Sequence, residues 1–153
     1  MRRLMAAVAA ITLTAATAAA AEDWQPADMS TNTLVGVEVS SIRGDARIRT
    51  ATVMLVYDRT GPGGVDFMVV AAGFDCATHT VAAIRNLYYS ADGTLLLSEG
   101  DVESAADSPI ERGSLMQSVE EMVCSGRRDP AGISDGIEFA ATARRLLLEG
   151  DRR

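Results

Sequence analysis

The sequence predicts an α+β domain, in which an antiparallel sheet of about five or six strands is packed by one or two α-helices and carries one disulfide. Segments between residues 33 and 99 alternate apolar and polar residues, as half-buried strands do. The connections between these segments are short, so neighbouring strands should run antiparallel. After residue 113 the apolar residues recur at helical spacing instead.

The chain opens with a segment typical of a secretory signal peptide. Arg2 and Arg3 precede an apolar run over residues 4–17, which is too short to span a bilayer. Small residues follow, and we expect cleavage between Ala21 and Glu22. No cysteine lies near that site, so we expect no lipid anchor, and no later segment is apolar enough to predict a transmembrane helix. Residues 1–21 are therefore interpreted as a signal, which leaves a chain the size of one domain.

The charge of the chain argues against two classes of partner. The whole sequence has a formal net charge of −7, and removing the two leader arginines makes the exported part more acidic still. Nucleic acids and anionic lipids both reward positive charge, so neither is an expected partner. All basic residues are arginine, which with the abundant alanine suggests a GC-rich bacterial genome.

Five strands are expected in order along the exported chain. In the first, Val35, Val37 and Val39 alternate with small or polar residues. Asp92-Gly93 suits a hairpin turn, because that turn needs residues that accept positive φ. The expected strands cover residues 33–42, 46–58, 65–76, 78–90 and 94–99. Residues 22–32 lack the alternation and are expected to be an irregular lead-in, with Trp24 packed against the fold.

Helices are expected after the strands. Ser114 stands three residues before Gln117, which is the spacing of a capping box, and Gly126 is placed to end the helix. Asp135 and Glu138 repeat the capping spacing before a second helix. The domain is thus expected to cover residues 33–126, with a linker and this second helix in residues 127–153.

The two cysteines, Cys76 and Cys124, are interpreted first as a disulfide, because an exported domain meets an oxidising compartment. Cys76 is also three residues from His79, the one histidine of the chain. A zinc site would lack ligands, since two cysteines and one histidine supply three at most. Free thiols, or a thiol nucleophile with His79 as its base, stay open as alternatives. The strand period would place Cys76 and His79 on opposite faces.

The order of several motifs resembles the surface-adhesin protein E family of exported bacterial domains, over most of residues 33–126. Asp75-Cys76 ends one strand, Tyr88-Tyr89 meets the Asp92-Gly93 turn, and Gly113-Ser114 begins a helix that carries Cys124. The resemblance implies an antiparallel sheet with a helix and a Cys76–Cys124 disulfide. No ligand-binding residue carries over from the family.

Two further groups could bind a partner. Arg43-Gly44-Asp45 is an RGD tripeptide that could engage integrins if exposed, although Gly44-Asp45 also suits a simple hairpin turn. Tyr88 and Tyr89 are adjacent on a strand, so one of them should face outward as a binding handle. A group of acidic residues lacks the spacing of a calcium loop and is interpreted as a solvated connection. It consists of Glu99, Asp101, Glu103, Asp107 and Glu111.

No catalytic motif is present: the sequence has no G-x-S-x-G elbow, no H-E-x-x-H and no Walker loop. We therefore expect a non-enzymatic protein of the bacterial cell envelope, periplasmic or secreted, with no metal and no cofactor. Its expected role is to bind a protein partner, adhesin-like by resemblance. The alternative is a small periplasmic hydrolase or a small-ligand carrier whose pocket the sequence does not reveal.

Overall fold

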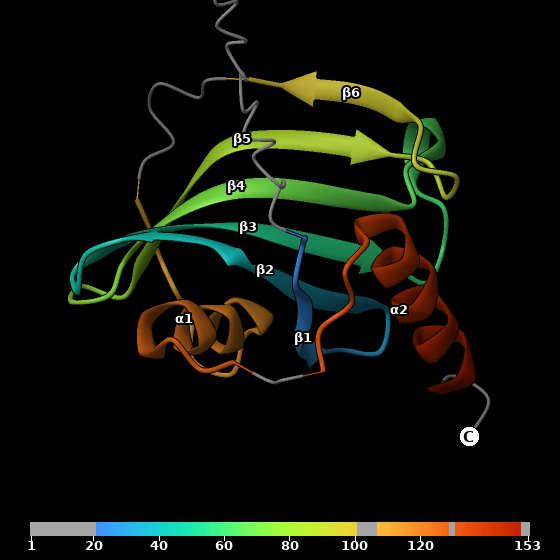
Figure 1. Cartoon of the computed structure of the whole chain (residues 1–153). Helices are drawn as coiled ribbons and strands as arrows, with labels where there is room; N and C mark the ends of the chain where they lie inside the picture. Colours follow the sequence, from blue (N-terminus) through green and yellow to red (C-terminus); the bar gives the residue numbers. More distant parts are fainter. Residues whose placement is uncertain (1–20, 101–106, 129–130, 151–153) are drawn as a thin grey trace, which may run out of the picture.

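The computed structural model describes residues 21–100, 107–128 and 131–150, which form one sheet with two α-helices (Figure 1). Over these residues the sheet has seven antiparallel strands, ordered β1 to β6 from edge to edge, and the short β7 pairs with β5. The predicted α+β class is confirmed. The strands are β1 (Trp24–Met29), β2 (Thr33–Gly44), β3 (Ile48–Tyr57), β4 (Phe67–Asp75), β5 (Thr80–Tyr89), β6 (Leu95–Glu99) and β7 (Ser108–Pro109). The helices are α1 (Leu115–Ser125) and α2 (Gly136–Gly150), and a 3-10 turn, η1 (Pro62–Gly64), precedes β4.

Strand β1 corrects the expectation of an irregular lead-in over residues 22–32. It pairs with β2 from Trp24 opposite Glu38 to Met29 opposite Leu34. Pro26 obscured the strand pattern, because proline cannot donate to a sheet ladder. The sheet accommodates it because β1 is an edge strand and its register shifts between Pro26 and Asp28.

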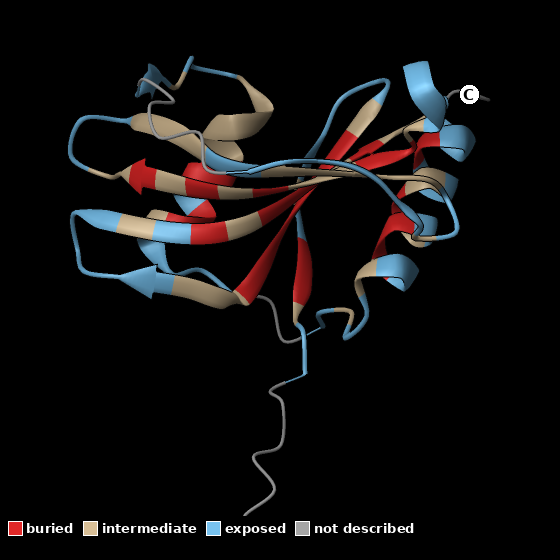
Figure 2. Cartoon of the chain, turned by 90° about the horizontal axis from the view of Figure 1, so that it is seen from above, coloured by how far each residue is buried: buried red, intermediate tan, exposed pale blue. Residues whose placement is uncertain are grey.

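The side chains of β3 alternate between two separate cores. Val53 packs in a cluster with Val119 and Val123 of α1, whereas the next residue, Met54, packs in a cluster with Phe139 of α2. Successive strand residues point to opposite faces, so α1 and α2 cover opposite faces of the sheet. They also lie toward opposite ends of the strands (Figure 1). The buried residues accordingly concentrate in the central strands and on the sheet-facing side of α2 (Figure 2).

Helix α1 begins and ends where the sequence predicts. The Ser114 side chain accepts a hydrogen bond from the Gln117 backbone N–H, and Gly126 adopts the left-handed conformation with φ 71° at the C-terminus. The predicted disulfide is confirmed: Cys124, near the end of α1, is bonded to Cys76 beyond the end of β4. The helix is therefore tied covalently to the sheet that it covers.

Helix α2 packs directly on the backbone of the sheet because β2 carries a glycine there. A Cβ atom at Gly36 would overlap the ring of Phe139. Phe139 is 3% exposed and stacks on Trp24 with the ring centroids 5.7 Å apart. The Glu22 carboxylate accepts hydrogen bonds from Trp24 Nε1 at 2.8 Å and from Gly136 N at 3.0 Å. Trp24 of β1 and the buried face of α2 thus belong to the same core as residues of β2, β3 and β4.

None of the described helices is long and apolar enough to cross a membrane.

We predict that Gly36→Ala destabilises the fold by about 1–3 kcal/mol, because the added methyl group overpacks a buried interface. Urea unfolding measures the change. The matched control is Gly61→Ala, where φ is −80° and the nearest atom to a new Cβ lies 3.5 Å away. Trimming the ring with Phe139→Leu should recover part of the loss in the double variant. A loss for Gly36→Ala no larger than that for Gly61→Ala would contradict the close packing of α2.

We also predict that replacing Cys76 and Cys124 together by serine lowers the free energy of unfolding by about 4 kcal/mol, because the bond closes a long loop in the unfolded chain. The sequence separation of the two cysteines is 48 residues. Urea unfolding with and without reductant gives the measurement. Reductant should weaken the wild type to the level of the serine variant and leave that variant unchanged. A wild type that is insensitive to reductant and equal in stability to the variant would refute the prediction.

Candidate functional site

Cys76 and His79 lie together in the turn that joins β4 to β5, which corrects the expectation that a strand would place them on opposite faces. The Asp75 carboxylate accepts hydrogen bonds from the backbone N–H groups of Ala77 at 2.9 Å and Thr78 at 3.2 Å. These bonds hold the pKa of Asp75 below its ordinary value, with Ala77 the larger contributor. The local bonding ends β4 at Asp75, and His79 follows with φ at 55°, the left-handed region.

His79 is hydrogen-bonded to the buried carboxylate of Glu120 on α1. Its Nδ1 lies 2.8 Å from Glu120 Oε1, and the side chain of Glu120 is only 9% exposed, compared with 71% for His79. Both residues line a cavity of about 390 Å³ beside the disulfide. The turn is therefore attached to α1 twice, covalently through Cys76 and by this hydrogen bond.

The arrangement around His79 offers little for nucleophilic catalysis. Both cysteines are consumed by the disulfide, so neither can act as a thiolate. Ser125 also lines the cavity, yet its hydroxyl donates to the backbone oxygen of Glu121. No cluster of three or more potential His, Cys, Asp or Glu ligands occurs among the residues that the structure describes. The contact of His79 with Glu120 joins the β4–β5 turn to α1.

The Arg43-Gly44-Asp45 tripeptide lies where β2 turns into β3. Gly44 has φ at 111°, and the Arg43 guanidinium donates to the backbone oxygens of Ser40 and Ile42. The Asp45 carboxylate accepts from the backbone N–H groups of Ile48 and Arg47, which lowers the pKa of Asp45. Both charged side chains thus make hydrogen bonds within their own hairpin.

Tyr88 and Tyr89 are both half-buried and lie on opposite faces of β5. The Tyr88 hydroxyl donates to Glu99 on β6 at 2.8 Å, and this hydrogen bond is the main reason that the pKa of Tyr88 is raised. Tyr89 stacks on Phe67 with centroids 5.0 Å apart and the rings within 9° of parallel. The Tyr88 contact joins β5 to β6, and the Tyr89 contact joins β5 to β4.

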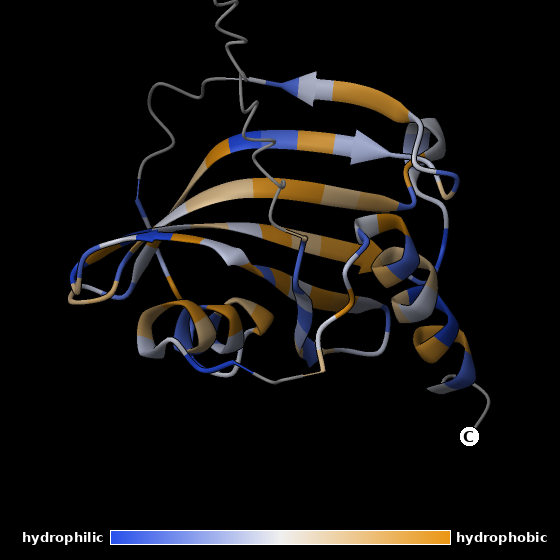
Figure 3. Ribbon diagram, in the orientation of Figure 1, coloured by the Kyte–Doolittle hydropathy of each residue, from blue (hydrophilic) through white to orange (hydrophobic). Residues whose placement is uncertain are grey.

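Strand β6 forms the far edge of the sheet from β1, and all five of its residues are exposed. Leu95, Leu96 and Leu97 are 50%, 42% and 52% exposed. Apolar residues occupy most of this ribbon (Figure 3). The side chains that complete the two cores extend to β5, so the leucines of β6 lie beyond them.

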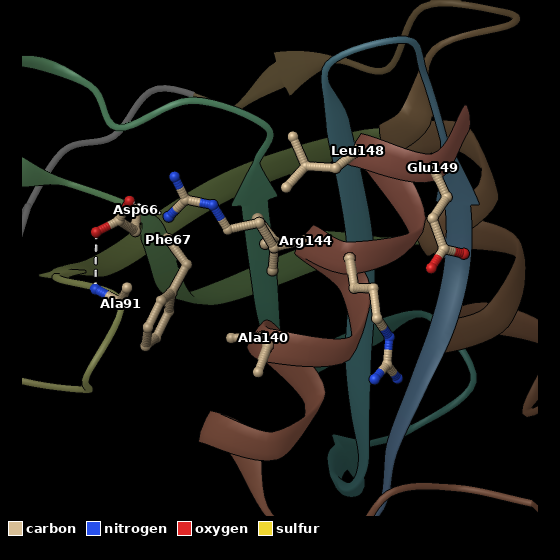
Figure 4. Close-up of a pocket in the computed structure, with 10 residues that line it drawn as sticks. Asp66, Phe67, Ala91, Ala140, Arg144, Leu148 and Glu149 are labelled. Atoms are coloured by element: carbon tan, nitrogen blue, oxygen red, sulfur yellow. Dashed lines mark hydrogen bonds and ion pairs between the residues drawn. The ribbon is translucent and has the colours of Figure 1, made fainter. Parts of the chain in front are cut away.

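A second cavity, of about 360 Å³, lies between α2 and the end of the sheet. Its floor comes from Val56 at the end of β3 and Phe67 at the start of β4, and Ala91 closes it from the β5–β6 turn. Ala140, Arg144 and Leu148 stand one helical turn apart on α2 and form its wall (Figure 4). Ala141, Arg145 and Glu149 complete the lining.

An ion pair between Asp66 and Arg144 forms one side of this cavity. The Asp66 carboxylate, almost fully buried, accepts from Arg144 Nη1, from the Thr60 hydroxyl at 2.6 Å and from Ala91 N at 2.7 Å. Burial by itself raises the pKa of Asp66, but these hydrogen bonds outweigh it and lower the pKa below its ordinary value. The carboxylate is therefore ionised at neutral pH and joins α2 to the loop around η1.

Several predicted residues lie outside the described residues or are exposed to solvent. Residues 1–20 of the expected signal lie outside the described residues, as do Asp101 and Glu103. At the expected cleavage site Ala21 is exposed, and a chain that begins at Glu22 retains both hydrogen bonds of the Glu22 carboxylate. Asp107 and Glu111 are exposed.

Comparison with models of known protein families and with curated protein sequences finds no match. The resemblance to the surface-adhesin protein E family therefore stays a prediction from the quoted motifs.

Sequence reasoning missed the cavity under α2. Its residues come from β3, β4, the β5–β6 turn and α2, and no local pattern links them. The one available signal is the Ala140-Ala141 pair, because small residues on a helix leave room beside it. Asp66 gives no signal of its own, since a single acidic residue after a turn is ordinary in a sequence.

We predict that Asp66→Asn destabilises the fold at neutral pH by about 1–3 kcal/mol, because charge-assisted hydrogen bonds to a buried group are lost. The pKa of Asp66 is lower when folded, so its contribution is present above the unfolded-state value of 3.8 and lost as pH falls through the folded value. Urea midpoints of both proteins from neutral to acidic pH measure this. The gap should narrow below pH 3.8; a gap that is constant with pH would contradict the ionised pair.

Proposed function

We propose that this chain is an exported, non-enzymatic binding protein of the bacterial cell envelope, which holds an extended segment of a partner protein along β6. The observation that carries the proposal is the exposure of every residue of that edge strand. An extended segment that pairs with an open edge gains main-chain hydrogen bonds, and pockets for its alternate side chains give selectivity.

The composition of β6 favours a partner rather than solvent at this edge. Natural proteins protect open edges with lysine, proline, inward-pointing charges or strong bulges, because open edges promote association. Strand β6 has the sequence LLLSE. It has a register shift at Leu96 but no lysine or proline, its three leucines are exposed, and its one charge lies at the end. Exposing this apolar surface to water does not stabilise the described fold. Binding of a partner segment to β6 explains the exposure.

The register of β6 places leucines on both faces of the sheet edge. Leu97 is opposite Tyr88, on the face that α1 covers further along, and Leu95 is opposite Tyr89, on the α2 face. Leu96 lies at the register shift between them. A partner strand with aliphatic residues on both faces would bury leucine on each side, so the expected partner segment is extended and apolar rather than charged.

Three features support export. The arginine pair and apolar run of residues 2–17 fit a signal peptide, and small residues precede Glu22. The Cys76–Cys124 disulfide suits an oxidising compartment. The quoted motifs resemble the surface-adhesin protein E family of exported bacterial domains. A periplasmic or secreted location follows as part of the proposal.

The experiment selects binders from a displayed random peptide library against the purified exported chain, and maps the best peptide by backbone amide chemical shifts. We expect the largest shifts in β6 and the adjacent part of β5. Leu95→Lys/Leu97→Lys should weaken binding about ten-fold or more, because both apolar contacts are removed. The matched control is Ile48→Lys, since Ile48 is 48% exposed on β3, away from β6.

Selected peptides that shift another surface, or that bind the double lysine variant as well as the wild type, would overturn the proposal. A library that yields no enriched sequence would do the same.

A further inference from the structure

The cavity under α2 combines a fixed apolar floor with an arginine at its wall. Val56, Phe67 and Ala140 are 1%, 4% and 5% exposed, and Phe67 is held in place by its stack on Tyr89. Rigid buried residues keep their positions when a ligand arrives, so little ordering is needed on binding. The cavity volume of about 360 Å³ lies within the range of small-molecule sites.

Arg144 presents hydrogen-bond donors that its partners in the protein do not use. A guanidinium has five N–H donors in a fixed planar fork. In Arg144, Nη1 donates to Asp66 and Nη2 to the Thr60 hydroxyl at 3.2 Å, and no other hydrogen bond of this side chain occurs within the described residues. Its side chain is 26% exposed and lines the cavity. Figure 4 shows Arg144 between Asp66 and Leu148, above Phe67.

The charged residues around the cavity determine which ligand charge it favours. Asp66 is occupied by three donors and has little capacity left to bind a cation. Arg145 and Glu149, both exposed, lie one turn apart among the lining residues and carry opposite charges. The buried end of the cavity therefore has donors to spare and no free acceptor of comparable strength, which favours a ligand oxygen with negative charge.

We propose that this cavity binds a small monocarboxylate with an apolar body. The carboxylate accepts from the free N–H groups of Arg144, and the body covers Phe67, Ala140 and Leu148. A phosphate ester or dicarboxylate fits less well, because Arg144 is already paired with Asp66 and the second lining arginine, Arg145, is exposed one turn from the acidic Glu149. The site is separate from the β6 edge, and the inference does not depend on the proposed function.

The test is an amide chemical-shift titration of the exported chain with 3-phenylpropionate, beside its neutral amide, 3-phenylpropanamide. We expect saturable shifts at Phe67, Ala91, Ala140 and Arg144, with the amide binding about ten-fold more weakly because it carries no charge. Equal binding of acid and amide would overturn the proposal. So would shifts confined to other surfaces, or no saturation up to about 10 mM.

Variants separate the site from general stability. Ala141→Phe should block the cavity without disturbing the core, because Ala141 is exposed on α2 and lines the cavity. Leu146→Phe is the matched control: Leu146 is 46% exposed on the same helix and does not line the cavity. Asp66→Asn/Arg144→Gln removes the pair together and leaves no single buried charge. Binding that survives both Ala141→Phe and the double variant would refute the assignment.

Discussion

The structure depends on the alternation of β3 between two cores. Its buried residues lie on both faces, since Val53 packs toward α1 and Met54 and Val56 pack toward α2. A strand with both faces covered cannot slip by one residue without exchanging its entire set of packing partners. This constraint fixes the register of β2 and β4 as well, because both pair with β3 along most of its length.

The same arrangement explains where surface remains for binding. The two helices cover the strands near β3, and the core side chains extend to β5, so β6 receives no cover from either core. Helix α2 carries Ala140 and Ala141 at positions where larger side chains would fill the cavity beside Phe67. The open edge therefore follows from helices that cover only part of a wide sheet, and the cavity follows from the small residues of α2.

Sequence reasoning succeeded where the signal was local. The alternation of Val35, Val37 and Val39, the Ser114 cap and the Gly126 terminus each follow from a few neighbouring residues. It failed at β1, because Pro26 breaks the pattern and pairing with β2 decides the structure. It also failed at His79, where the bonding of the Asp75 carboxylate to the backbone overrode the strand period. The exposure of β6 follows from the lengths and positions of the helices, which no local pattern encodes.

Residue-resolved amide hydrogen exchange of the chain from Glu22 onward tests this account most directly, because local stability follows the packing of each strand. The account predicts the slowest exchange in the central residues of β3, which both cores cover, and the fastest among the paired strands in β6. Removing the helix contact with Gly36→Ala should speed exchange in β2 and β3 more than in β6. Amides of β6 that exchange as slowly as those of β3 would contradict the account.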